Sequence, residues 1–187
     1  MGFFKTYSAF RNPHSAIGMH LIIDGYNLLH VNRFLTPLNV IQFQWERDRL
    51  IDQLSTYQKL KFCEITVVFD GWQGGWSTEK RERKNGIDLI FSKLGEKADE
   101  VIKRLVKEKG SGAIVITSDR DVSKFAERMD VAVIPSERFI EKIEQSEVHV
   151  DNIFEDQEEE GRSFKRKGPS RKLSKKEKRA RDALRKL

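Results

Sequence analysis

Four aspartates of this chain are placed where carboxylates commonly do chemistry. Asp24, Asp70 and Asp119 each follow a short apolar segment, and Asp121 lies two residues beyond the last of them. Clustered carboxylates repel one another and stay ionised when a cation lies among them. Oxygen ligands of this kind suit Mg²⁺ or Mn²⁺, which keep part of their water shell. A metal held in this way supports attack of water at phosphorus, so the pattern indicates metal-dependent cleavage of a phosphodiester.

Each acid, taken alone, also has a structural explanation. Asp99 opens a segment of helical periodicity, where a carboxylate interacts favourably with the helix N-terminus. Asp119 suits the N-cap of the helix after it, and Asp70 with Gly71 is ordinary turn chemistry. Asp24 is the hardest to explain in this way, because it ends an apolar strand directly before a glycine. Only the set as a whole favours a metal site.

Other chemistries fit the sequence less well. The chain has no G-x-x-x-x-G-K-S/T loop and no G-x-G-x-x-G after its first apolar segment. Asp24 lacks a second aspartate two residues on, which a phosphoaspartyl transferase would be expected to have. The histidines lack metal-ligand spacing and a cysteine cluster, and a satisfied surface position is the preferred interpretation of the one near Asp24. They are His14, His20, His30 and His149. A nucleotide-binding or phosphotransfer α/β domain remains an alternative.

Strands and helices alternate along most of the chain, which predicts an α/β fold. Apolar runs predict strands at 20–24, 64–69, 87–91, 113–117 and 131–134. Helical spacing predicts helices at about 38–60 and 96–109, one starting near Asp121 and one after Pro135. Alternation of this kind is typical of a mainly parallel sheet covered by helices on both faces. In such a sheet the strand ends that carry the aspartates meet at one edge.

Residues 71–86 have no periodicity and are expected to form a long loop. They mix Gly and Trp with cations, among them Arg81 and Lys84. Aromatic and basic side chains together suit stacking on unpaired bases and contact with phosphates, so Arg81 and Lys84 are candidate substrate-binding residues. A flexible, solubilising loop with one buried Trp explains the composition equally well.

Charge divides the chain into unequal parts. The whole chain carries +6, but the residues from Arg162 onward carry +11 and residues 1–161 carry −5. We therefore expect an N-terminal extension (1–18), one domain (19–145) and an acidic-then-basic tail (146–187) that is disordered and binds RNA through phosphate contacts. A linker with a solvated helical end is the alternative for this tail. A single cysteine, Cys63, excludes an intrachain disulfide, and no apolar run is long enough to cross a bilayer. Cytoplasmic location without membrane attachment is the default expectation, and the sequence leaves the oligomeric state open.

Four segments together carry a resemblance to a known family. IIDGYNLL, VVFDG, KADEVI and ITSDRDVSKFAERMDVAVIPSERF occur in this order between Met19 and Ile143. In order and spacing they resemble the YacP-like branch of the NYN domains, within the PIN-like nucleases. The resemblance implies a PIN-like α/β/α sandwich and an endoribonuclease that uses Mg²⁺ or Mn²⁺. Some relatives act on messenger RNA at the ribosome, so single-stranded mRNA and the ribosome are candidate partners.

The resemblance also implies roles for particular residues. Asp24, Asp99 and Asp119 match metal ligands, and Asp121 matches a supporting catalytic acid. Asn27 matches the polar residue of the DGYN turn and is a candidate substrate-binding residue, and Ser118 would position the site or bind the substrate. The role of Asp70 is less defined. From a different class, a non-catalytic RNA- or ribosome-binding module on the same fold is the main alternative to the nuclease.

Overall fold

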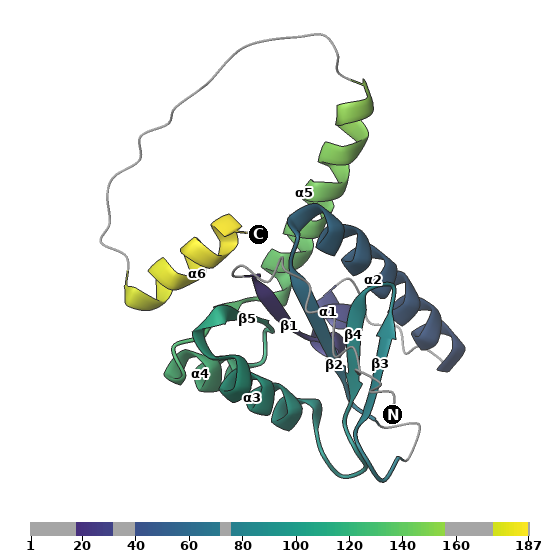
Figure 1. The fold of residues 1–187 in the computed structure, drawn as a ribbon, viewed down its shortest axis with the longest axis vertical. Coiled ribbons are helices and arrows are strands. Elements are labelled where there is room, and N and C mark those ends of the chain that lie inside the picture. Colours follow the sequence, from purple (N-terminus) through teal and green to yellow (C-terminus); the bar gives the residue numbers. More distant parts are fainter. Residues whose placement is uncertain (1–17, 32–39, 72–75, 156–173, 187) are drawn as a thin grey trace, which may run out of the picture.

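In the described part of the chain, six strands form one sheet, which is parallel except at one edge (Figure 1). The computed structural model describes residues 18–31, 40–71, 76–155 and 174–186, with side chains for all of these except 147–155 and 186. The strands are β1 (His20–Asp24), β2 (Glu64–Phe69), β3 (Lys80–Lys84), β4 (Ile87–Phe91), β5 (Ala113–Ile116) and β6 (Ala132–Ile134). Their order across the sheet is β3-β4-β2-β1-β5-β6. Only β3 runs antiparallel to its neighbour, β4.

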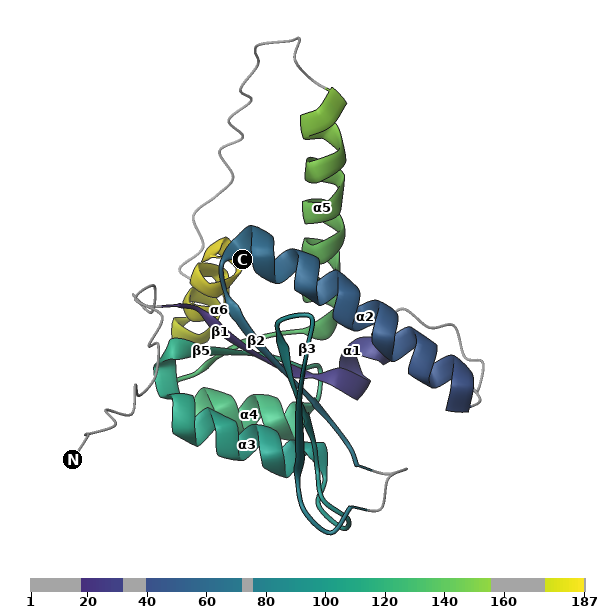
Figure 2. The same cartoon turned by 45° about the vertical axis from the view of Figure 1, so that its right-hand side comes forward.

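Helices cover both faces of the sheet, which confirms the predicted three-layer α/β/α architecture. They are α1 (Gly25–Val31), α2 (Val40–Lys61), α3 (Ala98–Lys109), α4 (Arg120–Arg128), α5 (Ser136–Glu155) and α6 (Lys175–Lys186), with a 3₁₀ turn at Gly110–Gly112. Figure 2 shows α3 and α4 on one side of the sheet, with α2 and α5 on the other. Each layer buries its own apolar cluster against the sheet.

The central strands β1, β2 and β5 are largely apolar on both faces because helices cover both faces there. In β1 every residue is buried, and Leu21 and Ile23 belong to one apolar cluster while Ile22 belongs to the other. The parallel register places Asp24 opposite Val68, one residue before the end of β2. The ends of these strands therefore lie at the same edge of the sheet, as the sequence predicted. They carry Asp24 at the end of β1, Asp70 after β2 and Thr117 after β5.

Part of the predicted loop 71–86 is a strand, and this prediction was wrong. β3 pairs with β4 through a two-residue turn at Asn85 and Gly86, which have φ values of 52° and 88°. Two positive φ values in Asn-Gly are the signature of a type I′ hairpin. All five residues of β3 are charged, which is how natural proteins protect an edge strand from pairing with another chain. That composition has no apolar alternation, so the strand was missed. Residues 72–75 lie outside the described residues.

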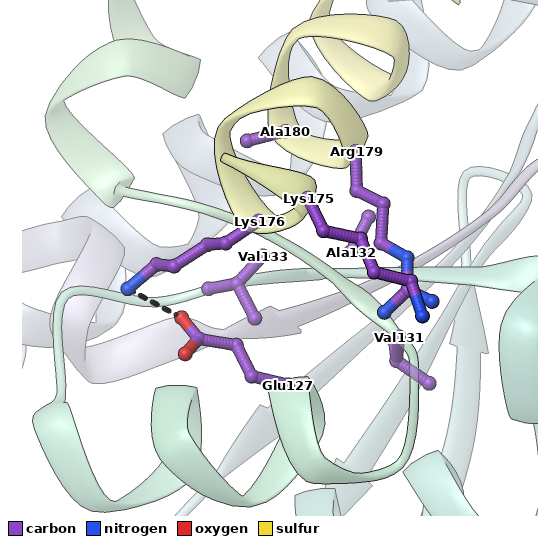
Figure 3. Close-up of a pocket in the computed structure, with 8 residues that line it drawn as sticks. All are labelled: Glu127, Val131, Ala132, Val133, Lys175, Lys176, Arg179 and Ala180. Atoms are coloured by element: carbon purple, nitrogen blue, oxygen red, sulfur yellow. Dashed lines mark ion pairs between the residues drawn. The ribbon is translucent and has the colours of Figure 1, made fainter. Parts of the chain in front are cut away.

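Two stretches of the tail that was predicted to be disordered are helical. α5 continues past residue 145 to Glu155, and α6 packs against β6. α6 is highly charged, yet its Ala183 is buried in the apolar cluster on that face. Near its start Lys176 pairs with Glu127 of α4 at 2.8 Å (Figure 3). A few small or apolar positions are thus enough to dock a basic helix.

Other parts of the predicted outer segments cannot be compared with the structure. Residues 156–173 of the tail and 1–17 of the N-terminal extension lie outside the described residues. Within the described ranges, no helix is both long enough and apolar enough to span a membrane.

Candidate active site

Among the described residues, five carboxylates line one hollow at the carboxyl edge of the sheet, which we call the acid pocket. Its volume is about 320 Å³, and its acidic lining residues are Asp24, Asp70, Asp99, Asp119 and Glu137. They come from the ends of β1 and β2, the start of α3, the turn after β5 and the start of α5. Tyr26, Asn27 and His30 complete the polar lining, and no Lys or Arg lines the hollow among the described residues. The pocket therefore has a strongly negative potential and attracts cations.

Asp24 is the most buried of these acids, with 6% of its surface exposed. Its Oδ1 accepts a hydrogen bond from the Asn27 backbone N–H (3.1 Å), and its Oδ2 accepts one from the Thr117 hydroxyl (3.1 Å). Burial raises the pKa of this carboxyl from its usual 3.8 to about 6. The two hydrogen bonds lower the pKa, and the nearby charges of Asp99 and Asp119 raise it. A cation in the pocket would favour the ionised form.

Asp99 and Asp70 face the same pocket from the next elements along the sheet. Asp99 lies in the first turn of α3, and burial followed by the charge of Asp119 raises its pKa. Asp70 follows β2, and its Oδ1 accepts a hydrogen bond from the Ala98 backbone N–H at 2.6 Å. Asp70 therefore satisfies one of the free N–H groups at the start of α3 and fixes that helix to the sheet edge.

Asp119 is the N-cap of α4, as the sequence allowed, and it also lines the acid pocket. Its Oδ1 accepts both cap hydrogen bonds, from the backbone N–H groups of Asp121 (2.8 Å) and Val122 (2.9 Å). Its own N–H donates to the Thr117 hydroxyl at 3.1 Å. Within the described part of the chain the cap occupies only Oδ1, so capping and a ligand role for Oδ2 are compatible.

Asn27 and Ser118 join three segments of the chain to one another. The Asn27 Oδ1 accepts hydrogen bonds from the Ser118 backbone N–H (3.0 Å) and from the Ser136 hydroxyl (3.1 Å). The Ser118 hydroxyl donates to Glu137 at 2.5 Å and accepts from the Ser136 N–H at 3.1 Å. The polar groups expected to contact a substrate are thus engaged within the protein, where they hold α1, the turn after β5 and α5 in place around the pocket.

Four of the predicted site residues do not line the acid pocket: Ser118, which lies between Thr117 and Asp119, and Asp121, Lys84 and Arg81. Asp121 is exposed and lines a separate hollow with Lys103. Lys84 is paired with Ile87 at the start of β4, so it lies at the opposite end of that strand from the pocket, and its Nζ is 2.9 Å from Asp48. Arg81 is exposed on β3, where it pairs with Glu79 at 2.7 Å.

Other residues of the site were missed or set aside in the sequence. Thr117 connects Asp24 to Asp119, and Glu137 adds a fifth carboxylate. Both follow a strand or open a helix at the carboxyl edge, the same positional signal that identified the aspartates. His30, assigned to the surface, is indeed exposed but lies at the pocket. Tyr26, inside the DGYN turn, carried no such signal.

Replacing Thr117 by valine should destabilise the protein and raise the pKa of Asp24 above about 6. The change removes a buried hydroxyl that donates to Asp24 and accepts from the Asp119 N–H. Losing a buried hydrogen bond to a charged group typically lowers the free energy of unfolding by about 1–3 kcal/mol. Chemical denaturation measures the stability, and a carboxyl NMR titration measures the pKa.

Thr56→Val is the matched control, because among the described residues the exposed Thr56 hydroxyl bonds only to the Asp52 carbonyl within α2 (3.2 Å). Its effect should stay within about 0.5 kcal/mol. Equal losses in both variants, or an Asp24 pKa that does not rise in Thr117→Val, would contradict the role given to Thr117.

The donor set of the acid pocket fits a hard divalent cation. Carboxylate oxygens are the ligands that Mg²⁺ and Mn²⁺ prefer. Among the residues that the structure describes, no three His, Cys, Asp or Glu side chains are close enough to hold one ion together. Mg²⁺ commonly binds through one or two carboxylates and keeps several water ligands. Carboxylates that are too far apart to hold one ion directly are therefore compatible with a Mg²⁺ site.

Comparison with known proteins gives a consistent result. A family model described as the YacP-like NYN domain matches residues 21–186. The protein YacP of Bacillus subtilis (strain 168) is 33% identical over 87 residues, which are 46% of this chain and 51% of that protein. The match thus spans about half the length of that relative.

Two crystal structures of Rae1 (YacP) from Bacillus subtilis share the fold. One of them, of a point mutant, matches with a TM-score of 0.60 at 24% identity, covering 71% of this chain and 79% of the other. A second structure matches with a TM-score of 0.58 at 26% identity, covering 72% and 79%. Since the family model spans nearly all of the chain, from β1 to α6, the chain belongs to the YacP-like NYN domain family and has its nuclease-like domain.

Proposed function

We propose that this protein is a metal-dependent endoribonuclease that hydrolyses phosphodiester bonds of single-stranded RNA. The observation that carries the proposal is the acid pocket, where five carboxylates gather at the carboxyl edge of the sheet without a Lys or Arg among the described lining residues. Membership of a family with a nuclease-like domain supports it. A pocket of this charge repels a phosphodiester unless cations neutralise it first.

Asp24, Asp99 and Asp119 are the residues that we expect to hold Mg²⁺ or Mn²⁺. A bound divalent cation would supply positive charge for the phosphate and for the charge that develops during hydrolysis. Thr117 orients Asp24 and Asp119 through one hydroxyl, and Asp70 fixes the start of α3 that carries Asp99. Asp121 supports Asp119 through its backbone N–H rather than as a ligand.

Asn27 and Ser118 are positioning residues in this proposal. Their hydrogen bonds hold the turn after β5 against α1 and α5, so that Asp119 stays at the rim of the pocket. Because their side chains already bond within the protein, we expect their replacement to change the site geometry more than RNA affinity. The Asp24 pKa of about 6 adds a pH dependence, since the ionised carboxylate is the form that binds a cation.

Messenger RNA held on a ribosome is the more specific substrate that we propose. The basis is the likeness to the YacP-like family, together with the basic helix α6, whose Lys175 and Lys178 are exposed. Exposed cations add affinity for phosphates without sequence choice. A non-catalytic RNA- or ribosome-binding module is the second candidate. It is favoured by the lack, within the described residues, of three ligands close enough for one ion.

Incubation with a circular single-stranded RNA of mixed sequence tests the proposal. An endonuclease opens the circle, whereas an exonuclease or a binding module leaves it closed. We expect linear products in Mn²⁺, none in EDTA, and, at Mn²⁺ concentrations that do not saturate the site, a rate that rises as the pH increases through about 6. A parallel reaction with translating ribosomes tests the mRNA substrate. Intact circles and intact ribosome-bound mRNA in Mn²⁺ would contradict the nuclease and favour the binding module.

A further inference from the structure

A second hollow, which we call the aromatic groove, lies next to the acid pocket and shares Tyr26 and Asp70 with it. It has a volume of about 220 Å³. Its side chains come from α1, α2, β2, β4 and the segment before β3, and the principal ones are Tyr26, Phe43, Arg47, Phe69, Trp76 and Phe91. The proposed function assigns nothing to this groove.

The rings of the groove form an ordered set of flat surfaces. Tyr26 stacks on Phe43, with centroids 5.1 Å apart and planes at 17°, and meets Phe69 edge-on at 5.8 Å. Phe69 stacks on Phe91 at 5.8 Å, and Trp76 meets Phe91 edge-on. Phe69 and Phe91 are buried and form the floor, whereas Tyr26 and Phe43 are half-buried and Trp76 is 37% exposed. The groove thus offers accessible aromatic surface at its rim.

Two cations accompany these rings. The Arg47 guanidinium lies 5.6 Å from the Phe91 ring centre, and the Lys80 ammonium lies 4.4 Å from that of Trp76. The Arg47 Nε is buried and has no hydrogen-bond partner among the described residues, since the Asp48 carboxylate is 3.7 Å away. A buried donor without an acceptor is costly, and a ligand that supplies an oxygen would relieve that cost.

We propose that the aromatic groove binds an unpaired RNA base, belonging to the nucleotide beside the phosphate that the acid pocket receives. Aromatic rings combined with cations are the means by which proteins bind single-stranded nucleic acid, with the rings stacking on bases and the cations meeting phosphates. A base paired within a duplex cannot leave its stack without a cost, so the groove selects single strands. This inference rests on the proposed function and adds to it a subsite for the base next to the phosphate.

A purely structural cluster explains only part of the groove. Packing accounts for Phe69 and Phe91, which belong to the apolar cluster on this face, and for the buried sides of Tyr26 and Phe43, which pack against it. It does not account for the half-open rim, for an Arg47 Nε that has an ion pair with Asp48 but no hydrogen bond among the described residues, or for the two residues shared with the acid pocket. The same features are all expected of a base-binding subsite that adjoins a phosphate-binding one.

The test measures binding of a 12-nucleotide single-stranded RNA to the full chain by fluorescence anisotropy. Every protein carries Asp24→Asn, so that cleavage does not affect the result. Trp76→Leu and Arg47→Met are each expected to weaken binding about fivefold or more, since stacking of one base alone has an effect of that size. Trp45→Leu is the matched control, because Trp45 is also an exposed indole beside a cation, Arg49, but lies outside the groove.

An abasic version of the same oligonucleotide separates base stacking from phosphate contact. With this probe the effect of Trp76→Leu should disappear, while Arg47→Met retains a loss from its charge. Binding of the base-containing RNA by Trp76→Leu at the parent affinity would overturn the inference. So would an equal loss with the abasic probe, or no RNA binding by the parent. The two proposals can also fail separately. If the variants bind RNA as expected but the wild-type chain does not open circular RNA, the proposed nuclease function is contradicted and the base-binding groove is not.

Discussion

Replacing Asp24 by asparagine should abolish RNA cleavage and, at the same time, stabilise the metal-free protein at neutral pH. Asp24 is the most buried acid of the pocket and lies beside two other carboxylates. Changing groups that only orient a metal ligand typically costs 10–100-fold in affinity or activity, so loss of a ligand should exceed about 100-fold. Asparagine keeps the shape of the side chain and the oxygen that accepts from the Asn27 N–H.

The gain in stability follows from the raised pKa of Asp24. Between about pH 4 and 6 the folded protein binds a proton at Asp24 that the unfolded chain has released, so stability falls as the pH rises through this range. The loss is complete above about pH 6 and amounts to at most about 3 kcal/mol for a shift of this size. Asn has no such charge, so the stability of Asp24→Asn should lack this component of the pH dependence.

Denaturant unfolding of metal-free protein between pH 4 and 8, together with cleavage in Mn²⁺, measures both effects. Asp88→Asn is the control, because Asp88 lies on β4 near its other end, in a surface ion pair with Arg83 at 3.6 Å. That variant should keep the parent activity and differ in stability by less than about 1 kcal/mol. Cleavage by Asp24→Asn at the parent rate would contradict the assigned site.

Replacing Gly71 by alanine should disrupt the acid pocket by displacing the backbone that carries its acids. A Cβ at Gly71 would lie 1.9 Å from the Ser92 carbonyl oxygen, which belongs to the backbone just after β4. The Gly71 N–H also donates to the Ser92 hydroxyl at 3.1 Å. Relief of the clash requires the ends of β2 and β4 to separate, which moves Asp70 and the start of α3 that it holds. We expect a loss of about 3 kcal/mol, at the upper end of the usual range for overpacking.

Gly112→Ala is the matched control for this change. A Cβ at Gly112 meets nothing within 4 Å, and its backbone is not in the left-handed region. Its stability should therefore stay within about 1 kcal/mol of the parent. Thermal unfolding and cleavage in Mn²⁺ measure the two variants side by side. If Gly71→Ala were as stable and active as Gly112→Ala, the close approach of β2 and β4 at the pocket would be wrong.

The sequence predicted the sheet and the main acids of the pocket because both depend on one local signal. An apolar run that ends at an acid, as Ile22 and Ile23 end at Asp24, marks a buried strand and its carboxyl end together. Parallel strands then bring their carboxyl ends to one edge without further information. Asp99 and Asp119 follow from the same rule, because each opens a helix after that edge.

Features that depend on contacts between distant segments could not be predicted in this way. Nothing local distinguishes an Asn27 that contacts RNA from one that accepts the Ser118 N–H, 91 residues further along the chain. Glu137 and Lys84 are similar cases, since only the packing of α5 and the register of β3 show which of them is near the pocket. The hairpin is different, because Asn85-Gly86 was a readable turn signal before Ile87.

Calorimetric titration of Mn²⁺ into the metal-free protein at pH 7.5 tests the central claim most directly. The claim is that the acid pocket holds a divalent cation through Asp24, Asp99 and Asp119. We expect the wild-type protein and Asp88→Asn to bind Mn²⁺ with the same affinity, and Asp99→Asn to bind it at least about tenfold more weakly. Equal affinity of wild-type protein and Asp99→Asn for Mn²⁺, or no binding by either, would contradict the account.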